Sequence, residues 1–166
     1  MSVSIKRLGP GDEATLELLA QEDADFDLEG RGAPLTPLKP GMARAYLANP
    51  GVLHWVASEG GAITGFLCCS YVLLRSDPGH ELLLYEIGVR KSARRTGVGR
   101  ALLAHMEAWM KLNDVSVVWV CADNQEAVEF YRGCGFATDQ PQPVYMTRAV
   151  ELPPPRNVAT LLSVPR

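Results

Sequence analysis

The sequence predicts one α/β domain of the α+β type, in which a mixed, mostly antiparallel sheet of about six to seven strands is flanked by about four helices. Gly60 and Gly61 separate two apolar runs and are typical of the turn of an antiparallel hairpin. Further on, apolar runs at residues 81–89 and 115–122 enclose a helical pattern at 97–112, which predicts a parallel strand pair joined by a helix. The chain has 166 residues, of which 47% are hydrophobic, so it can bury one core.

The first fifty residues predict a strand followed by two helices. Apolar and polar residues alternate over residues 3–8, as in a strand with one buried face. A Gly-Pro-Gly break follows, and Asp12 is placed to cap a helix that continues to about Gln21. An acidic stretch and a loop rich in glycine and proline then lead to a second helix at residues 42–48.

The middle of the chain predicts the hairpin strands at residues 53–59 and 62–74, before the strand at 81–89. The helix at 97–112 has apolar residues at the spacing of a face packed on a sheet. The run at 115–122 is almost continuously apolar, which predicts a strand covered on both faces.

The C-terminal part predicts one more helix and one more strand. Asn124 and its neighbours are typical of a helix start, and Gly133 and Gly135 end that helix. Residues 144–152 predict a last strand, which three prolines terminate. We therefore expect a domain over residues 1–152 and a proline-rich tail over 153–166.

Charge and hydropathy exclude several classes of protein. The net charge of −3 disfavours general binding of nucleic acid, because such domains are normally basic. No apolar run is long enough to span a bilayer, and no early segment has the pattern of an export signal. The expectation is a cytoplasmic protein that binds neither nucleic acid nor membrane.

Cysteine and histidine spacing does not indicate a metal site. The cysteines are Cys68, Cys69, Cys121 and Cys134, and they include no C-x-x-C pair. Most lie in apolar runs, which favours buried, reduced thiols over disulfides or metal ligands. The three histidines are scattered and form no H-E-x-x-H pattern, so we expect no bound metal.

The most informative segment is the strand, turn and helix over residues 82–103. A helix start leaves backbone N–H groups without partners and carries partial positive charge, so it favours a phosphate group. Gly97 and Gly99 allow close approach of a ligand to the backbone. Basic residues surround this turn, namely Arg90, Lys91, Arg94, Arg95 and Arg100. The segment therefore predicts an anion site, with a plain basic surface turn as the alternative.

Two common phosphate-binding patterns are absent from this segment. No Lys-Ser/Thr follows Gly99, as a nucleoside triphosphatase would require. The first strand is not followed by G-x-G-x-x-G, as a dinucleotide-binding fold would require.

The motif Arg94-x-x-Gly97-x-Gly99, with Asn124 followed by Ala127, Phe130, Tyr131 and Gly135-Phe136, resembles the GCN5-related N-acetyltransferases (GNAT). The resemblance covers about residues 3–150, and it implies the GNAT fold with a splayed parallel strand pair. It also implies acetyl-coenzyme A as the co-substrate. Its pyrophosphate would be held by the turn residues Arg94, Arg95, Thr96, Gly97, Val98, Gly99 and Arg100.

The resemblance further implies a bulge in the strand before the turn, for which Gly88 is suited. Backbone groups near Ile87 and Val89 would then bind the pantetheine arm and the thioester. Asn124 would bind pantetheine or only cap its helix. The chain departs from the family pattern at Lys91 and Ala93, where proline and an aromatic or apolar residue are common.

Amine acetylation needs a neutral amine, and two residues are candidates for the proton transfers. Glu86 lies within the apolar strand, where burial would raise its pKa towards that of a general base. It would otherwise be a structural partner of an arginine. Tyr131 matches the family tyrosine that donates a proton to the departing thiolate, or it is a plain core aromatic.

The acceptor amine is suggested by a narrower resemblance, to class I aminoglycoside 3-N-acetyltransferases, which share a tyrosine followed by an acidic residue before the apolar end of the motif strand, here Tyr85-Glu86. That resemblance implies a role in antibiotic resistance. The acidic stretch would attract a polycationic amine through its long-range field, or it is a solvated loop. Its acidic residues are Glu22, Asp23, Asp25, Asp27 and Glu29.

Other acceptors and another class of protein stay open. A polyamine, a peptide or a protein N-terminus fits the same residues. A coenzyme-A-binding sensor or scaffold without turnover is the alternative of a different class. The last strand and the tail are compatible with a homodimer.

Overall fold

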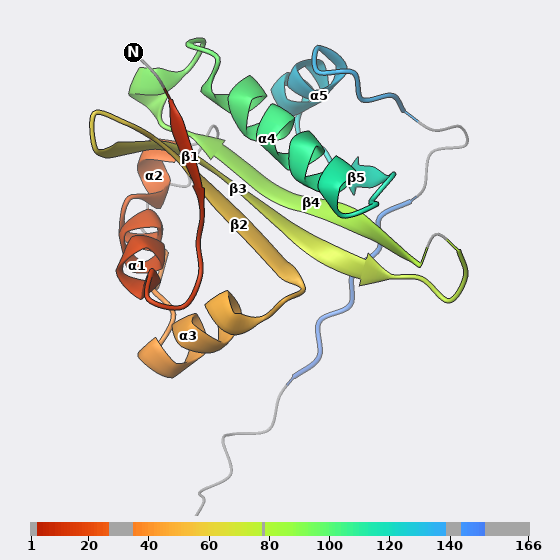
Figure 1. Ribbon diagram of the computed structural model, residues 1–166, viewed down its shortest axis with the longest axis horizontal. Helices are drawn as coiled ribbons and strands as arrows, with labels where there is room; N and C mark the ends of the chain where they lie inside the picture. Colours follow the sequence, from red (N-terminus) through yellow and green to blue (C-terminus); the bar gives the residue numbers. More distant parts are fainter. Residues whose placement is uncertain (1–2, 27–34, 78, 139–143, 152–166) are drawn as a thin grey trace, which may run out of the picture.

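The computed structural model describes residues 3–26, 35–77, 79–138 and 144–151 (Figure 1). Its elements in chain order are β1 (Ser4–Arg7), α1 (Glu13–Gln21), α2 (Asp23–Phe26), α3 (Pro40–Ala48), β2 (Val52–Glu59), β3 (Ala62–Leu73), β4 (His80–Val89), a 3-10 turn η1 (Lys91–Ala93), α4 (Val98–Leu112), β5 (Val118–Val120) and α5 (Gln125–Arg132).

The five strands form one mixed sheet in the order β1-β2-β3-β4-β5. All neighbours are antiparallel except β4 and β5, which are parallel. Gly60 and Gly61, both at positive φ, make the predicted turn between β2 and β3. The predicted fold class, a GNAT fold with a parallel pair in a mostly antiparallel sheet, is confirmed.

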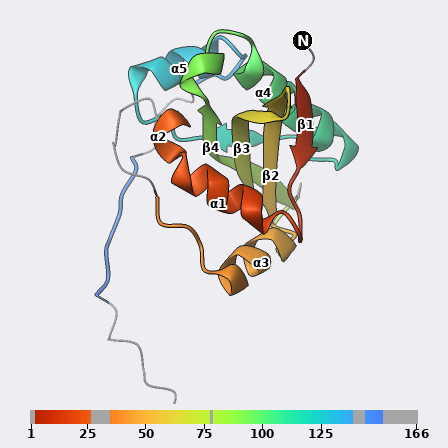
Figure 2. The same cartoon turned by 90° about the vertical axis from the view of Figure 1, so that its left-hand side faces the viewer.

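Helices cover both faces of the sheet. α1 and α3 lie on one face, and α4 lies on the other beside α5 (Figures 1 and 2). α4 presents Val98, Leu102 and Met106 to the sheet, and each is at most 1% exposed. Gly65 of β3 allows this close approach, because a Cβ there would lie 2.8 Å from Val98 Cγ1. The α4 face holds the larger core, and a smaller core around Phe66 lies under α1–α3.

Within the described residues the sheet has fewer strands than predicted, because the expected strand at residues 144–152 is wrong. Residues 144–151 have no regular secondary structure, and residue 152 lies outside the described residues. Exposed fractions of 70–84% are found for Val144, Tyr145, Met146 and Val150. An alternating pattern makes a strand only where a sheet edge accepts its hydrogen bonds, and these residues pair with no described edge.

The strand predicted at residues 115–122 is shorter and less covered than expected. β5 comprises Val118–Val120, and Trp119 is 39% exposed. β5 pairs with β4 only at Leu82–Leu84. The residues that flank β5 therefore lack the hydrogen bonds to β4 that would extend the strand. Cys121 follows the end of β5 and is exposed, unlike the buried thiol predicted, whereas Cys68 and Cys69 are buried and free.

Three further findings concern helix α2, the predicted tail and membrane spans. Helix α2 follows α1 almost directly, where only an irregular loop was expected. The predicted tail, residues 153–166, lies outside the described residues. No helix in the described part of the chain is long and apolar enough to cross a membrane.

Candidate active site

A cleft opens where β4 and β5 separate. Their pairing ends at Leu84 and Val120, and beyond these residues the strands diverge. The cleft has a volume of about 1110 Å³. Pockets for one small ligand usually have roughly 300–1,000 Å³, so this cleft has room for more than one. The predicted site residues that line it are Asp23, Tyr85, Glu86, Ile87, Gly88, Val89, Arg94, Arg95, Thr96, Gly97, Val98, Gly99, Arg100, Asn124 and Tyr131.

The bulge in β4 lies at Tyr85 and not at Gly88, where it was predicted. Cys68 pairs with Glu86 and Cys69 pairs with Leu84, so Tyr85 is the extra residue. Tyr85 is 72% exposed and lines the cleft. In a regular strand, successive side chains point to opposite faces of the sheet. The bulge interrupts this alternation where β4 loses its pairing with β5, and the successive residues Tyr85 and Glu86 are both exposed.

The glycine at position 88 is required by packing and not by a bulge. It pairs with Phe66 of β3, and a Cβ at Gly88 would lie 2.4 Å from Phe66 Cε1. The ring therefore packs directly over the Gly88 backbone. Phe66 also lines the cleft, and sequence reasoning missed it, although its place opposite a strand glycine was a usable signal.

The turn after β4 has the backbone conformation of an anion site. Arg95 and Gly97 both have positive φ, of 65° and 96°, and α4 starts directly after Gly97. Positive φ next to a helix start turns successive N–H groups towards one side. Gly99 packs against α5, since a Cβ there would lie 3.1 Å from Phe130 Cζ. These observations fit a bound pyrophosphate held by residues 94–100.

Two of the basic side chains predicted to surround the turn, those of Arg90 and Arg94, bind other groups of the protein. Arg94 donates hydrogen bonds to the carbonyl oxygens of Val89 and Phe26, both at 3.2 Å. Arg90 is engaged by two carboxylates from another part of the chain, described below. The Arg95 side chain is 91% exposed and lies 3.9 Å from Glu126. The Arg90 and Arg94 side chains are thus engaged within the protein, and the Arg95 side chain is exposed.

Glu86 is exposed, whereas burial was predicted for it. The reason is the separation of β4 from β5, which leaves this face of β4 open to the cleft. Its cross-strand partner is Cys68. Glu86 thus lies at a solvent-accessible point of the cleft, where an amine can reach it.

Tyr131 projects from α5 and is only 6% exposed, yet it lines the cleft. Its ring contacts Phe130 and Phe136, with centroids 5.3 and 5.2 Å away. Burial, with Asp123 nearby, raises the pKa of the Tyr131 phenol. The phenol therefore keeps its proton at neutral pH and is a hydrogen-bond donor.

Asn124 caps α5, the more modest of the two roles considered for it. Its Oδ1 accepts a hydrogen bond from the Ala127 N–H at 2.8 Å. Its Nδ2 donates to Asp123 Oδ1 at 3.0 Å. Asn124 also lines the cleft, so the cap positions its backbone beside the space for a ligand.

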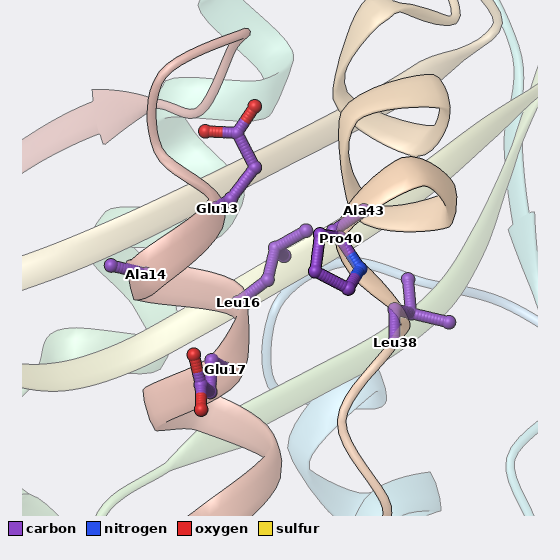
Figure 3. Close-up of a pocket in the computed structure, with 7 residues that line it drawn as sticks. All are labelled: Glu13, Ala14, Leu16, Glu17, Leu38, Pro40 and Ala43. Atoms are coloured by element: carbon purple, nitrogen blue, oxygen red, sulfur yellow. The ribbon is translucent and has the colours of Figure 1, made fainter.

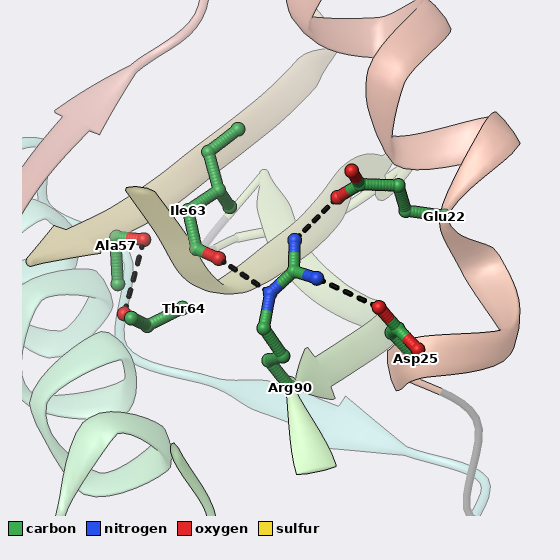
Figure 4. A network of polar contacts seen from close by, with 6 residues as sticks. All are labelled: Glu22, Asp25, Ala57, Ile63, Thr64 and Arg90. Carbon is green, nitrogen blue, oxygen red and sulfur yellow. Dashed lines mark hydrogen bonds and ion pairs between the residues drawn. The ribbon is translucent and has the colours of Figure 1, made fainter. Parts of the chain in front are cut away.

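The acidic stretch divides into paired carboxylates and one that lines the cleft. Glu22 and Asp25 form ion pairs with Arg90, which lowers their availability to a substrate (Figure 4). Asp23 lies between them, is 8% exposed and lines the cleft. Asp27 and Glu29 lie outside the described residues.

A buried polar chain lies behind Glu86. His54 Nδ1 and Tyr46 Oη are 3.0 Å apart, and Tyr46 Oη is 3.0 Å from Cys68 Sγ. His54 is buried, and its Nε2 has no hydrogen-bond partner among the described residues. Burial lowers the pKa of His54 to about 4 and raises the pKa of the Cys68 thiol.

Two other features of the molecule bear on ligand binding. A second, smaller hollow of about 150 Å³ lies between α1 and α3, lined by Leu16, Leu38, Pro40 and others (Figure 3). Its lining combines apolar side chains with those of Glu13 and Glu17, and none of the predicted site residues lines it. Within the described residues, no group of three metal-ligating side chains is assembled.

Comparison with protein families adds independent evidence. The Acetyltransferase (GNAT) family matches residues 17–136, which include the turn, Glu86 and Tyr131. Ribosomal protein bS18-alanine N-acetyltransferase of Escherichia coli (strain K12) is 29% identical over 101 residues, 58% of this chain and 64% of that protein. A 5-NmdU N-acetyltransferase of Pseudomonas phage PaMx11 is 34% identical over 88 residues, 53% of this chain and 59% of that protein. The matched regions span less than two thirds of these relatives.

Solved structures share the fold at low identity. An aminoglycoside acetyltransferase from an uncultured soil metagenomic sample, in complex with trehalose, has a TM-score of 0.78 at 19% identity and covers 90% of this chain and 97% of that one. A ribosomal-protein-alanine N-acetyltransferase from Brucella melitensis has a TM-score of 0.69 at 21% identity, covering 91% and 100%. Since the family match spans most of the chain and the splayed strands and glycine turn agree with it, the chain belongs to the GNAT acetyltransferase family.

Proposed function

We propose that this protein transfers the acetyl group of acetyl-coenzyme A to a primary amine. The observation that carries this proposal is the single cleft that joins the turn at residues 94–100 to Glu86 and Tyr131. When bound, acetyl-coenzyme A supplies an acetyl group activated as a thioester. The left-handed residues Arg95 and Gly97 and the start of α4 support the binding of its pyrophosphate.

Glu86 is the proposed general base and Tyr131 the proposed general acid. Glu86 takes a proton from the ammonium group of the acceptor, directly or through a water, so that the amine can attack. Tyr131 donates its phenol proton towards the sulfur that leaves. Because its raised pKa makes the phenol a weak acid, its main effect is a hydrogen bond that stabilises the departing thiolate.

Direct transfer is proposed, because the thiol opposite Glu86 is poorly suited to form a covalent intermediate. The thiol closest to Glu86 in the sheet register is that of Cys68, which is 8% exposed. Burial raises its pKa, so it stays protonated and is a poor nucleophile.

The proposed acceptor is a small cationic amine, and an aminoglycoside fits this description. Asp23 and Glu86 place two carboxylates in the cleft, which favours a substrate with more than one amino group. A structure with the same fold is that of an aminoglycoside acetyltransferase. An N-terminal alanine is the second candidate, supported by the match to ribosomal protein bS18-alanine N-acetyltransferase.

The test is release of free thiol from acetyl-coenzyme A in the presence of amines. Sisomicin, spermidine and a peptide that begins with alanine represent the three acceptor classes. Saturable release with sisomicin is the expected result, and preference for the peptide would move the acceptor to the second candidate. Tight binding of acetyl-coenzyme A without release for any amine would favour a binding module and contradict the proposal.

A further inference from the structure

Arg90 links the end of β4 to helix α2 across 65 residues of sequence. Its Nη1 donates to Asp25 Oδ2 at 2.8 Å, its Nη2 pairs with Glu22, and its Nε donates to the carbonyl oxygen of Ile63 at 2.9 Å (Figure 4). The guanidinium carbon also lies 4.8 Å from the ring centroid of Phe26. We call Arg90, Glu22 and Asp25 the Arg90 latch.

The latch carboxylates are next in sequence to the residues of α2 that line the cleft. Asp23 and Phe26 both line it, and they alternate along the chain with the latch carboxylates. Arg94, which follows η1, adds a hydrogen bond to the Phe26 carbonyl at 3.2 Å. This wall of the cleft is thus attached to the strand that leads into the turn.

A helix as short as α2 depends on such contacts. It has four residues, and one helical turn does not form stably by itself. The Arg90 side chain is only 23% exposed, so its pairs are screened less than those on an open surface. Its planar fork lets it bind two carboxylates and a carbonyl at once, which a lysine ammonium cannot match in geometry.

We propose that Arg90 is a positioning residue for the acceptor amine: through Glu22 and Asp25 it holds Asp23 and Phe26 in the wall of the acceptor site. This inference rests on the proposed function. It assigns Arg90 to the acceptor side of the cleft, although the sequence places it among the basic residues of the anion turn. It also explains why, of the three acidic residues that the structure describes in this stretch, Asp23 lines the cleft while Glu22 and Asp25 pair with Arg90.

The test compares Arg90→Met, Arg90→Lys and the control Arg44→Met in the thiol-release assay with sisomicin, spermidine and the alanine peptide. Arg44 also pairs with a glutamate, Glu13 at 3.7 Å, but is 80% exposed and lies outside the cleft. For Arg90→Met, KM for the best amine rises at least tenfold while KM for acetyl-coenzyme A stays within twofold. Arg90→Lys recovers part of the loss, and Arg44→Met matches the wild type.

Hydrogen exchange of the amides at residues 22–26 provides a readout that is independent of turnover. These amides exchange faster in Arg90→Met than in the wild type, and those of Arg44→Met do not. Unchanged exchange, unchanged amine KM, or an equal rise in both KM values would overturn the inference. If the wild type releases no thiol with any amine, the proposed function itself fails. If the wild type is active but Arg90→Met changes the KM for the amine and the KM for acetyl-coenzyme A equally or not at all, only the inference about Arg90 fails.

Discussion

At the scale of residues, Glu86 and Tyr131 reach the cleft from different elements and differ in environment. Glu86 is exposed on β4, while Tyr131 is buried on α5 with a raised pKa. An exposed carboxylate can exchange protons with solvent, whereas a buried phenol retains its proton. This difference in environment supports the opposite tasks proposed for the two groups.

Replacing Tyr131 with phenylalanine removes the phenol and keeps the ring packing. We expect Tyr131→Phe to lower kcat at least tenfold, because the hydrogen bond to the departing sulfur is lost. Acetyl-coenzyme A binding, measured by calorimetry, should change little. Tyr71→Phe is the matched control, since Tyr71 packs against His80 and Trp109 away from the cleft. Equal turnover of Tyr131→Phe and wild type would remove Tyr131 as the donor.

Replacing Glu86 with glutamine removes the base without changing the size of the side chain. We expect Glu86→Gln to lose rate near neutral pH and to recover part of it at high pH, where the amine is deprotonated unaided. The measurement is a pH–rate profile of kcat/KM, with Glu81→Gln in the same strand as control. A loss that stays constant across pH would contradict the base role.

At the scale of elements, the bulge in β4 and the separation of β4 from β5 make the site. Tyr85 is the bulged residue, which has no partner in the register with β3. The pairing of β4 with β5 stops at Leu84, directly before it. Beyond this point β4 still pairs with β3 as far as Val89, but its other edge pairs with no described strand and lines the cleft, where a ligand can reach it. The close contact of Phe66 with Gly88 fixes the same part of β4 from the other side.

Adding a methyl group at Gly88 tests this contact. Because the new Cβ would lie 2.4 Å from the Phe66 ring, we expect Gly88→Ala to lower the free energy of unfolding by about 1–3 kcal/mol. Urea denaturation measures the change, and Gly9→Ala, with nothing within 4 Å, is the control. Addition of Phe66→Leu should recover part of the loss. A Gly88→Ala protein as stable as the wild type would show that the ring moves aside at little cost.

At the scale of the whole molecule, the two faces of the sheet have different tasks. The α4 face holds the larger apolar core, while the α1–α3 face holds the smaller core and the buried chain of His54, Tyr46 and Cys68. His54 is neutral in the folded protein because burial lowers its pKa to about 4. Its unfolded value is 6.5, so the unfolded chain takes up a proton first as pH falls.

The stability of the protein should therefore decrease as pH falls from about 6.5 towards 4. The sign follows because the depressed pKa contributes nothing while His54 is neutral in both states, and favours the unfolded state once His54 is protonated only in the unfolded chain. Between pH 7.5 and 5, the wild type should lose about 2 kcal/mol more than His54→Gln, measured by urea denaturation. Equal pH dependence of the two proteins would show that His54 is protonated as readily when folded.

The sequence by itself determined the fold class, the hairpin, the parallel pair and the residues of the turn. These depend on local signals: periodicity of apolar residues, paired glycines, and a glycine-containing helix start. It also made three residues candidates for the site: Asn124 and Tyr131 through the resemblance to a family motif, and Glu86 through its place in the apolar strand before the turn.

Only the tertiary structure decided the position of the bulge, the exposure of Glu86, the partners of Arg90 and the fate of residues 144–151. Each depends on what lies opposite in space, such as Cys68 and Cys69 across the β4 ladder or Glu22 beside Arg90. Local patterns show that a residue is charged or apolar, but its pairing or exposure depends on elements that are far apart in the sequence. For this protein, that is why the anion turn could be predicted, whereas the arginine that holds the acceptor wall could not.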